Sequence, residues 1–195
     1  MPMRDIDRSW ASPVRVTLRD GRDMIVRLLD SADGEAMGEF YASIPVEDNR
    51  YYIGPTGTTA DNARLRAAGA DNALEVALVL EGRDGKIYGE AWYRWEAPEA
   101  AKSMFGICIS RQCQNCGAGR AIMTRLLEVA RCCGPAIMTL TVQKENVRAV
   151  ALYMRMGFAI IREQLRPARP DCPPLPEYYM ELQTRGAGPT DAQPC

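Results

Sequence analysis

Apolar and polar residues alternate along two short stretches near the start of the chain. Val14 to Leu18 and Met24 to Leu28 follow this period-two pattern, and a turn at 19–22 between them predicts a pair of strands. Helical spacing over 32–42 then predicts a helix that Asp30 or Ser31 caps. The region 43–62 is rich in Pro, Gly, Thr, Asn and Tyr, which predicts a long loop of the kind that often carries function.

The remainder of the chain changes repeatedly between strand and helix patterns. A further short helix is expected at 62–69, and longer helices at 117–132 and 146–156. Strands are expected at 74–81, 86–96, 102–110, 136–142, 158–161 and 178–182. This order predicts a mixed sheet with helices on its faces. We expect one domain over 14–183, a flexible N-terminal segment at 1–13 and a disordered tail at 184–195.

Composition and charge narrow the class of protein. The chain is 47% hydrophobic and 25% charged with a net charge of −1, which suits a globular domain and argues against nucleic acid as a partner. No apolar run is long enough for a membrane span, and the N-terminus has no signal-like apolar segment. The odd count of 7 cysteines, in or beside apolar segments, predicts reduced thiols and a cytoplasmic location.

Histidine is absent from the whole sequence. This excludes Ser-His-Asp and Cys-His nucleophile systems and the usual ligand sets of zinc hydrolases. Any proton transfer must therefore use Glu, Asp, Tyr, Cys, Lys or water.

A glycine-containing segment lies between the strand predicted at 102–110 and the helix that follows it. It reads Gln114-Asn115-Cys116-Gly117-Ala118-Gly119, with Arg111 and Arg120 at its ends. Unpaired N–H groups and the helix dipole make such a helix start favourable for a diphosphate, and glycines allow close approach to the backbone. The motif alone is weak, since glycines often only let a chain turn.

The cysteines of the same region allow two other interpretations. Cys113 and Cys116 have CxxC spacing, and Cys132 and Cys133 are adjacent. A zinc ribbon would repeat the CxxC spacing, and adjacent helical side chains point about 100° apart, so a metal site is not expected. A redox pair requires a cysteine of lowered pKa, and a helix N-terminus can provide that.

A second motif, NVRAVALYMRMGF, covers Asn146 to Phe158. Asn146 can cap a helix start, and Gly157 suits the left-handed position after a helix end. Taken alone, this is a capped amphipathic helix that leads into a strand, with Tyr153 as a core residue.

Together, in this order and spacing, the two motifs resemble the GNAT superfamily of CoA-dependent N-acyltransferases. The family carries a (Q/R)-x-x-G-x-(G/A) loop after a strand, then a helix, a strand and an N-x-x-A-x-x-(L)-Y-x-x-x-G-F segment. The resemblance implies an α/β fold of α+β type. Its central sheet is mixed, mostly antiparallel and twisted, with about seven strands, helices on both faces, and a splay between the fourth and fifth strands.

The resemblance also implies acetyl-CoA as co-substrate and assigns residues to it. The pantetheine arm would lie between the strands at 105–109 and 137–142, bonded by the backbone like an added strand. Asn146 would contact the pantetheine or the helix start. The implied binding residues are Ile107, Cys108, Ile109, Gln114, Asn115, Cys116, Gly117, Ala118, Gly119, Arg120 and Asn146.

In the implied reaction, an amine attacks the acetyl thioester and Tyr153 protonates the departing thiolate. Many relatives carry a glutamate just before the glycine of the CoA-facing strand, but this chain has Phe105 before Gly106. Glu90 on the neighbouring strand, on the side shared with Glu96, is the alternative base, and ordered water is another.

The acceptor is expected to be a small-molecule or peptide amine. By resemblance, residues 43–66 and 163–178 would close over it, with the proline-rich segment at 162–179 as a stiff loop. Acidic and aromatic residues of the first region could hold an ammonium group, or could belong to a solvated loop. They are Glu47, Asp48, Tyr51 and Tyr52. A non-catalytic acyl-CoA sensor is the alternative function, and a homodimer is left open.

Overall fold

Twelve helices and strands of regular length build the part of the chain that the computed structural model describes, residues 12–48, 51–52, 58–168 and 173–185. Three short 3-10 helices, Ser31–Asp33, Val46–Asp48 and Arg111–Cys113, lie in the connections. The elements in chain order are β1 Val14–Thr17, β2 Asp23–Leu28, α1 Gly34–Ala42, α2 Ala60–Ala68, β3 Glu75–Gly82, β4 Ile87–Arg94, β5 Lys102–Ile109, α3 Ala118–Cys132, β6 Ile137–Gln143, α4 Val147–Arg155, β7 Ala159–Arg166 and β8 Leu175–Gln183.

The strands form one open sheet of 8 strands in the order β1-β2-β3-β4-β5-β6-β8-β7. Every neighbouring pair is antiparallel except β5 and β6. This confirms the mixed, mostly antiparallel sheet, with one strand more than the expected seven or so. Because of this extra strand, the splay that was expected between the fourth and fifth strands lies between the fifth and sixth, β5 and β6.

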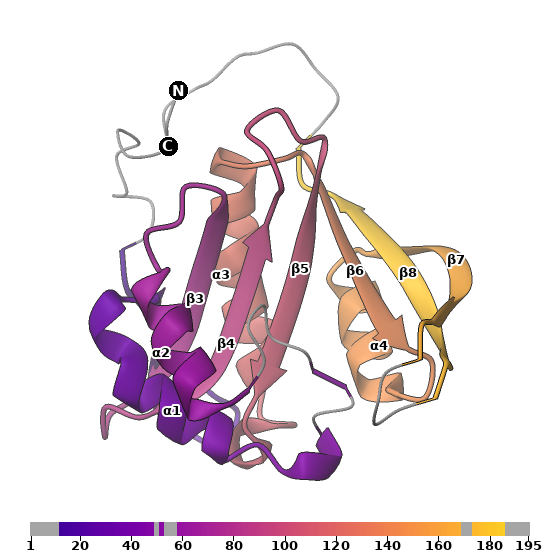
Figure 1. Cartoon of the computed structure of the whole chain (residues 1–195). Helices are drawn as coiled ribbons and strands as arrows, with labels where there is room; N and C mark the ends of the chain where they lie inside the picture. Colours follow the sequence, from indigo (N-terminus) through magenta and orange to yellow (C-terminus); the bar gives the residue numbers. More distant parts are fainter. Residues whose placement is uncertain (1–11, 49–50, 53–57, 169–172, 186–195) are drawn as a thin grey trace.

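Helices cover the two faces of the sheet. In Figure 1, α1 and α2 lie in front of β3 and β4, and α3 lies behind them. Helix α3 is strongly amphipathic because one side of it is apolar and fully buried, including Ile122, Met123 and Leu126. A smaller core lies on the other face, where Met37, Phe40 and their neighbours pack against the sheet. The two cores place the centre of the sheet between apolar layers.

Strands β5 and β6 pair over only a short length. Their parallel ladder joins Lys102 to Ile137 and ends at Met104 and Thr139. Beyond that point the strands diverge, as Figure 1 shows, with α4 beside the separation. Three aromatic rings pack together there: Phe105 meets Tyr153 edge-on at 5.9 Å, and Phe158 lies 5.9 and 6.0 Å from the two.

The end of the chain departs from the sequence prediction in two places. Strands β7 and β8 are longer than expected and pair from Ala159–Glu181 to Arg166–Leu175, so the proline-rich segment at 162–179 is mostly strand. Residues 169–172 lie outside the described part. Thr184, one residue beyond the predicted domain boundary at 183, donates its N–H to the carbonyl of Ala136 at 2.8 Å. The segments 1–11 and 186–195 also lie outside the described residues.

A buried ionic cluster joins α2 to the sheet. Arg66 donates from Nε to Glu90 Oε1 at 2.6 Å and forms an ion pair with Glu75 on β3. The three side chains are almost completely buried. One guanidinium therefore holds two carboxylates of adjacent strands beneath the helix layer.

Replacing Arg66 tests how strongly this cluster holds the fold. Arg66→Met leaves two buried carboxylates unpaired, and we expect the free energy of unfolding at pH 7 to fall by about 3–5 kcal/mol. The matched control is Arg64→Met on the same helix, where the ion pair with Asp61 is exposed. Its effect should stay within about 0.5 kcal/mol. Urea unfolding measures both, and equal effects would contradict a structural role for the cluster.

The same variant has an expected pH dependence. Burial raises the pKa of Glu75, and the Glu90 charge adds to this against the opposing effect of Arg66. A carboxyl of raised pKa stabilises the fold in its protonated form, and this stability is lost as pH rises through that pKa. The deficit of Arg66→Met should therefore shrink as the pH is lowered towards the ordinary glutamate range.

Candidate active site

The segment at 114–120 joins the end of β5 to the start of α3. Asn115 has a φ of 62° and Gly117 a φ of 97°, so two left-handed residues turn the chain into the helix. Gly117 is the N-cap of α3 and no side chain caps the helix. The first amide groups of α3 are therefore left to a ligand or solvent, and the helix dipole favours an anion there.

The two glycines of the motif serve different purposes. A Cβ on Gly119 would lie 3.3 Å from Leu152 Cδ2 of α4, so this glycine permits close packing between the helices. A Cβ on Gly117 would meet only Arg19, at 3.7 Å. Gly117 thus borders the open side of the helix start. Of the two glycines that the sequence assigned to phosphate approach, only Gly117 borders this open side, and Gly119 packs against α4.

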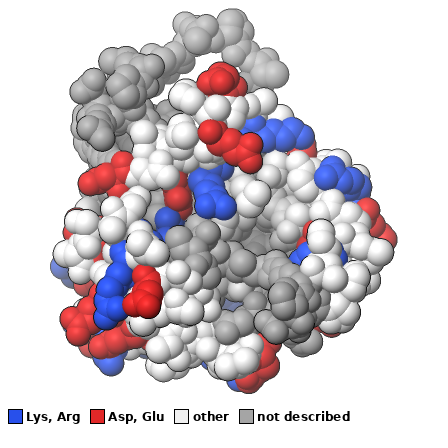
Figure 2. Space-filling model, viewed as in Figure 1, with Lys and Arg blue, Asp and Glu red and all other residues white. Residues whose placement is uncertain are grey.

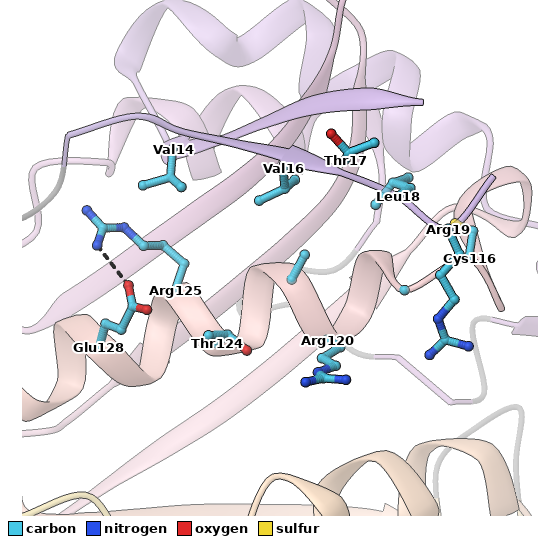
Figure 3. A pocket seen from close by; sticks show the side chains of 12 residues that line it. Val14, Val16, Thr17, Leu18, Arg19, Cys116, Arg120, Thr124, Arg125 and Glu128 are labelled. Atoms are coloured by element: carbon cyan, nitrogen blue, oxygen red, sulfur yellow. Dashed lines mark hydrogen bonds and ion pairs between the residues drawn. The ribbon is translucent and has the colours of Figure 1, made fainter. Parts of the chain in front are cut away.

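Two arginines, Arg19 and Arg120, lie beside the start of α3, whereas the sequence indicated Arg111 and Arg120. Arg111 is engaged elsewhere, because its guanidinium bonds to Asp48 at 2.7 Å and to Glu47 at 2.9 Å. Arg120 is exposed beside the helix start, and Arg19 joins it from the turn after β1. Neither Arg19 nor Arg120 forms an ion pair within the described residues. Figure 3 shows the two side chains extending to the same side of α3.

Arg19 was missed by sequence reasoning. Its N–H donates to the carbonyl of Cys116 at 2.8 Å, which fixes the turn after β1 against the segment at 114–120. No local pattern marks it, because the contact joins parts of the chain about a hundred positions apart.

A cavity of about 430 Å³ lies between β1 and the first half of α3. Val14, Val16 and Leu18 line one side, and Arg120 and Thr124 line the other (Figure 3). Arg125 and Glu128 pair at its far end, at 2.9 Å. None of its lining residues comes from β5 or β6. It is therefore separate from the divergence of those strands.

Strand β5 directs alternate backbone groups to its two edges. Ser110 donates to the Tyr88 carbonyl at 2.9 Å, which fixes the alternation. Cys108 therefore directs its backbone groups to β4, and Ile107 and Ile109 direct theirs to the side where β6 has diverged. Two further bonds agree: the carbonyl of Ile109 accepts from Gln114 Nε2 at 3.1 Å, and that of Ser103 accepts from Thr139 Oγ1 at 2.9 Å.

Tyr153 lies on α4 beside this diverging edge. The residue is 8% exposed and packs against Phe105 and Phe158. Its hydroxyl has no hydrogen-bond partner in the described part of the chain. Burial raises the pKa of Tyr153, with a contribution from the Cys108 thiol, so the phenol keeps its proton at neutral pH. Asn146 caps α4 by accepting from Ala149 N–H at 3.2 Å, which is the helix-start role of its two predicted roles.

Glu90 is buried, whereas its position in a strand would also have allowed an exposed carboxylate. It is 0% exposed, on the face of β4 covered by α1 and α2. Its Oε2 accepts from the hydroxyls of Tyr41 and Tyr52, each at 2.9 Å. Glu96 does not share this environment, because β4 ends at Arg94 and Glu96 is exposed beyond it.

Gly106 is explained by a neighbouring ring. A Cβ there would lie 2.4 Å from Trp92 Cζ2. Trp92 covers this glycine and donates from Nε1 to the Tyr52 hydroxyl at 3.2 Å. Tyr52, which the sequence placed in a loop over the acceptor, is thus part of a buried network around Glu90.

The cysteines near α3 pack against one arginine. Arg22 donates to Cys113 Sγ at 3.2 Å, and Cys116 Sγ donates to the Cys113 carbonyl at 2.8 Å. Both are free thiols, as are Cys108 and Cys133. In the described ranges, no group of three or more Cys, Asp or Glu side chains is arranged to hold a metal ion.

Positive and negative side chains are mixed on the face of the molecule that Figure 2 shows. Lysine and arginine side chains alternate there with aspartate and glutamate over the described atoms. Among the described helices, none combines the length and apolar character that crossing a bilayer requires.

Comparison with known proteins agrees with this geometry. L-methionine sulfoximine/L-methionine sulfone acetyltransferase of Salmonella typhimurium is 25% identical over 140 residues, which cover 70% of this chain and 81% of the relative. Mycothiol acetyltransferase of Beutenbergia cavernae is 35% identical over 82 residues, 42% of this chain, and the match spans only 27% of that relative's length.

A similar fold occurs in an acetyltransferase from Salmonella typhimurium that was solved with acetyl-CoA. The TM-score is 0.72 at 22% identity, with 87% of this chain and 99% of that one covered. The model of the acetyltransferase (GNAT) family matches residues 39–158, which include β3 to α4 and both motifs. The chain belongs to the GNAT family of acetyltransferases.

Proposed function

We propose that this chain transfers the acetyl group of acetyl-CoA to the primary amine of a small molecule or peptide, with the β5 edge and the start of α3 as the acetyl-CoA site. The observation that carries the proposal is the short β5–β6 ladder, which leaves the backbone groups of Ile107 and Ile109 directed to an edge without a partner strand. An extended amide chain can add to such an edge by strand-like hydrogen bonds.

The residues at the start of α3 suit a diphosphate. The segment from Gln114 to Arg120 supplies uncapped amide groups, and Arg19 and Arg120 supply positive charge without carboxylate partners in the described residues. Charge-assisted bonds of this kind are the stronger hydrogen bonds to phosphate. Cys108 is not needed in this proposal as a backbone contact, since its N–H and C=O are directed to β4.

When bound, acetyl-CoA supplies the thioester carbonyl that an amine attacks. The chain must then move two protons, because an ammonium has to become neutral before attack and the thiol has to be restored. Tyr153 is suited to the second task, since its hydroxyl is protonated at neutral pH and has no other partner in the described residues. The Glu90 network, on the other face of the sheet, is suited to the first.

The acceptor class follows from the same side of the molecule. Glu47 and Asp48 of the 3-10 helix share the single positive charge of Arg111, which leaves negative charge near the end of β5, and negative charge favours an ammonium group. The methionine sulfoximine acetyltransferase that matches this chain is named for amino-acid derivatives. A cytoplasmic location is part of the proposal.

The proposed activity is tested with purified chain, acetyl-CoA and a panel of amino acids, polyamines and peptides. Release of free thiol that depends on one class of amine is the expected result. Tight CoA binding without thiol release for every amine would instead favour the non-catalytic sensor.

Gly117→Glu tests the diphosphate site. A side chain at φ 97° strains the backbone, and its carboxylate would face the bound anion, so we expect CoA affinity to fall at least about 100-fold by calorimetric titration. The control is Gly85→Glu, which introduces the same charge at a φ of 76° in a hairpin with nothing within 4 Å of the new Cβ. If the two variants bind CoA alike, the diphosphate lies elsewhere.

Tyr153→Phe tests the proposed acid. Removing the hydroxyl should lower kcat by roughly 10²- to 10⁴-fold, because the thiolate would leave without a proton donor. The dissociation constant for CoA should change little, since the ring still packs against Phe105 and Phe158. An unchanged kcat would remove Tyr153 from the reaction.

A further inference from the structure

The proposed acetyl-CoA site accounts for the pantetheine arm and the diphosphate, but not for the nucleotide of CoA. Beyond its diphosphate, CoA continues into an adenosine that carries a 3′-phosphate, so this nucleotide lies beside the start of α3. The side that faces α4 is closely packed, because a Cβ on Gly119 would lie 3.3 Å from Leu152 and 3.8 Å from Ile109. On the other side, a Cβ on Gly117 would meet only Arg19 within 4 Å. The nucleotide is therefore directed away from α4 and towards β1.

The cavity of about 430 Å³ between β1 and α3 begins at this point. Cys116, Gly117 and Arg120 belong to the proposed diphosphate segment, and all three are among its lining residues. The cavity is thus continuous with the diphosphate site. Its volume falls in the range of small-molecule pockets, roughly 300–1,000 Å³.

The walls of the cavity suit a flat aromatic base. Val14 and Val16 of β1 form one wall, and Ala121 and Thr124 of α3 form the other (Figure 3). Val14 is 36% exposed, so a base placed against it would remove apolar surface from water. The hydroxyl of Thr124 can donate or accept a hydrogen bond at the polar edge of a base.

The charges of the cavity are arranged for anions at one end only. Arg19 and Arg120 lie at the end near the start of α3, and neither is ion-paired in the part of the chain that the structure describes. At the far end, the carboxylate of Glu128 is neutralised by Arg125 at 2.9 Å. Arg120 is in the first turn of α3, beside the amides proposed for the diphosphate. Arg19 comes from the turn after β1 and is available to a second phosphate group.

We propose that the cavity between β1 and α3 holds the adenosine 3′-phosphate of CoA. The base lies between the apolar wall of β1 and that of α3, and the 3′-phosphate accepts charge-assisted hydrogen bonds from Arg19. Arg120 remains with the diphosphate. This inference rests on the proposed acetyl-CoA site, and it adds β1 and the turn that follows it to the elements that bind the co-substrate.

Arg19→Gln tests the 3′-phosphate contact. Calorimetric titration compares CoA with 3′-dephospho-CoA, which differs only in that phosphate. We expect wild-type chain to bind CoA at least about 10-fold more tightly, because the second ligand lacks the charge-assisted bonds. Arg19→Gln should reduce this preference to within about threefold by weakening CoA alone. The matched control Arg120→Gln should weaken both ligands by a similar factor, since the diphosphate is common to them.

Ala121→Phe tests the position of the base. The new ring fills the cavity from α3, so the affinities for CoA and for 3′-dephospho-CoA should both fall by at least about 10-fold. The matched control is Ala68→Phe, which places the same ring at an exposed position of α2 on the opposite face of the sheet. It should leave both affinities within about twofold of wild type. Thermal unfolding checks that the variants fold. If Ala121→Phe does not, Thr124→Phe at an exposed position of the same wall replaces it.

The outcomes separate this inference from the proposed function. Wild-type chain that binds neither ligand would overturn the acetyl-CoA site and the inference together. If wild-type chain binds CoA and releases thiol with an amine, the proposed function stands, and three results would overturn the inference alone. These are equal affinity of wild type for the two ligands, an equal loss for both in Arg19→Gln, and wild-type affinity in the variant that fills the cavity.

Discussion

The divergence of β5 from β6 is the constraint on which the proposed chemistry depends. A parallel ladder that continued to Ile109 would use every backbone group of that edge, and no extended ligand could add to it. The ladder stops at Met104, and the next residue of β5, Phe105, packs with the rings of Tyr153 and Phe158. The same contacts fix the ring of Tyr153, the proposed proton donor, against the first residue of β5 beyond the ladder.

The two helix layers divide the proposed proton transfers between them. Tyr153 comes from α4, beside the large core that includes α3, and Glu90 is held by α1, α2 and the loop that carries Tyr52. Cys108 of β5 lies opposite Glu90 in the β4–β5 ladder. Because the donor and the acceptor of protons lie in different layers, they do not neutralise one another, and each keeps a separate environment.

Much of the framework could be predicted from local sequence. The loop at 114–119 and the segment from Asn146 to Phe158 combine caps, turn glycines and apolar spacing, which neighbouring residues determine among themselves. The order of strands and helices followed for the same reason. Strand β7 was underestimated because residues 162–166 are polar apart from Leu165 and show no period-two pattern. Pairing with β8 at the edge of the sheet, where both sides meet solvent, makes it a strand nonetheless.

The surroundings of the chemical groups could not be predicted in this way. Glu90 was identified as a candidate base, but its burial depends on Tyr41, Tyr52 and Arg66, which three other segments bring to it. Arg19 lies beside the start of α3, although it belongs to the turn after β1 and is far from α3 along the sequence. Such contacts are set by the register of the sheet and the docking of helices, and no spacing along the chain records them.

The buried cluster also limits how robust the fold can become. Buried ion pairs are often outperformed by apolar side chains of similar volume, so a chain selected for thermal endurance alone would be expected to replace Glu75, Arg66 and Glu90 together. As long as these residues are retained, α2 is linked to the sheet by buried charges, and their desolvation costs free energy. Because the proposed reaction uses Glu90 for proton transfer, the cluster cannot be replaced to obtain a more thermostable protein. Stabilising substitutions are then expected in the core on the other face of the sheet and on the surface.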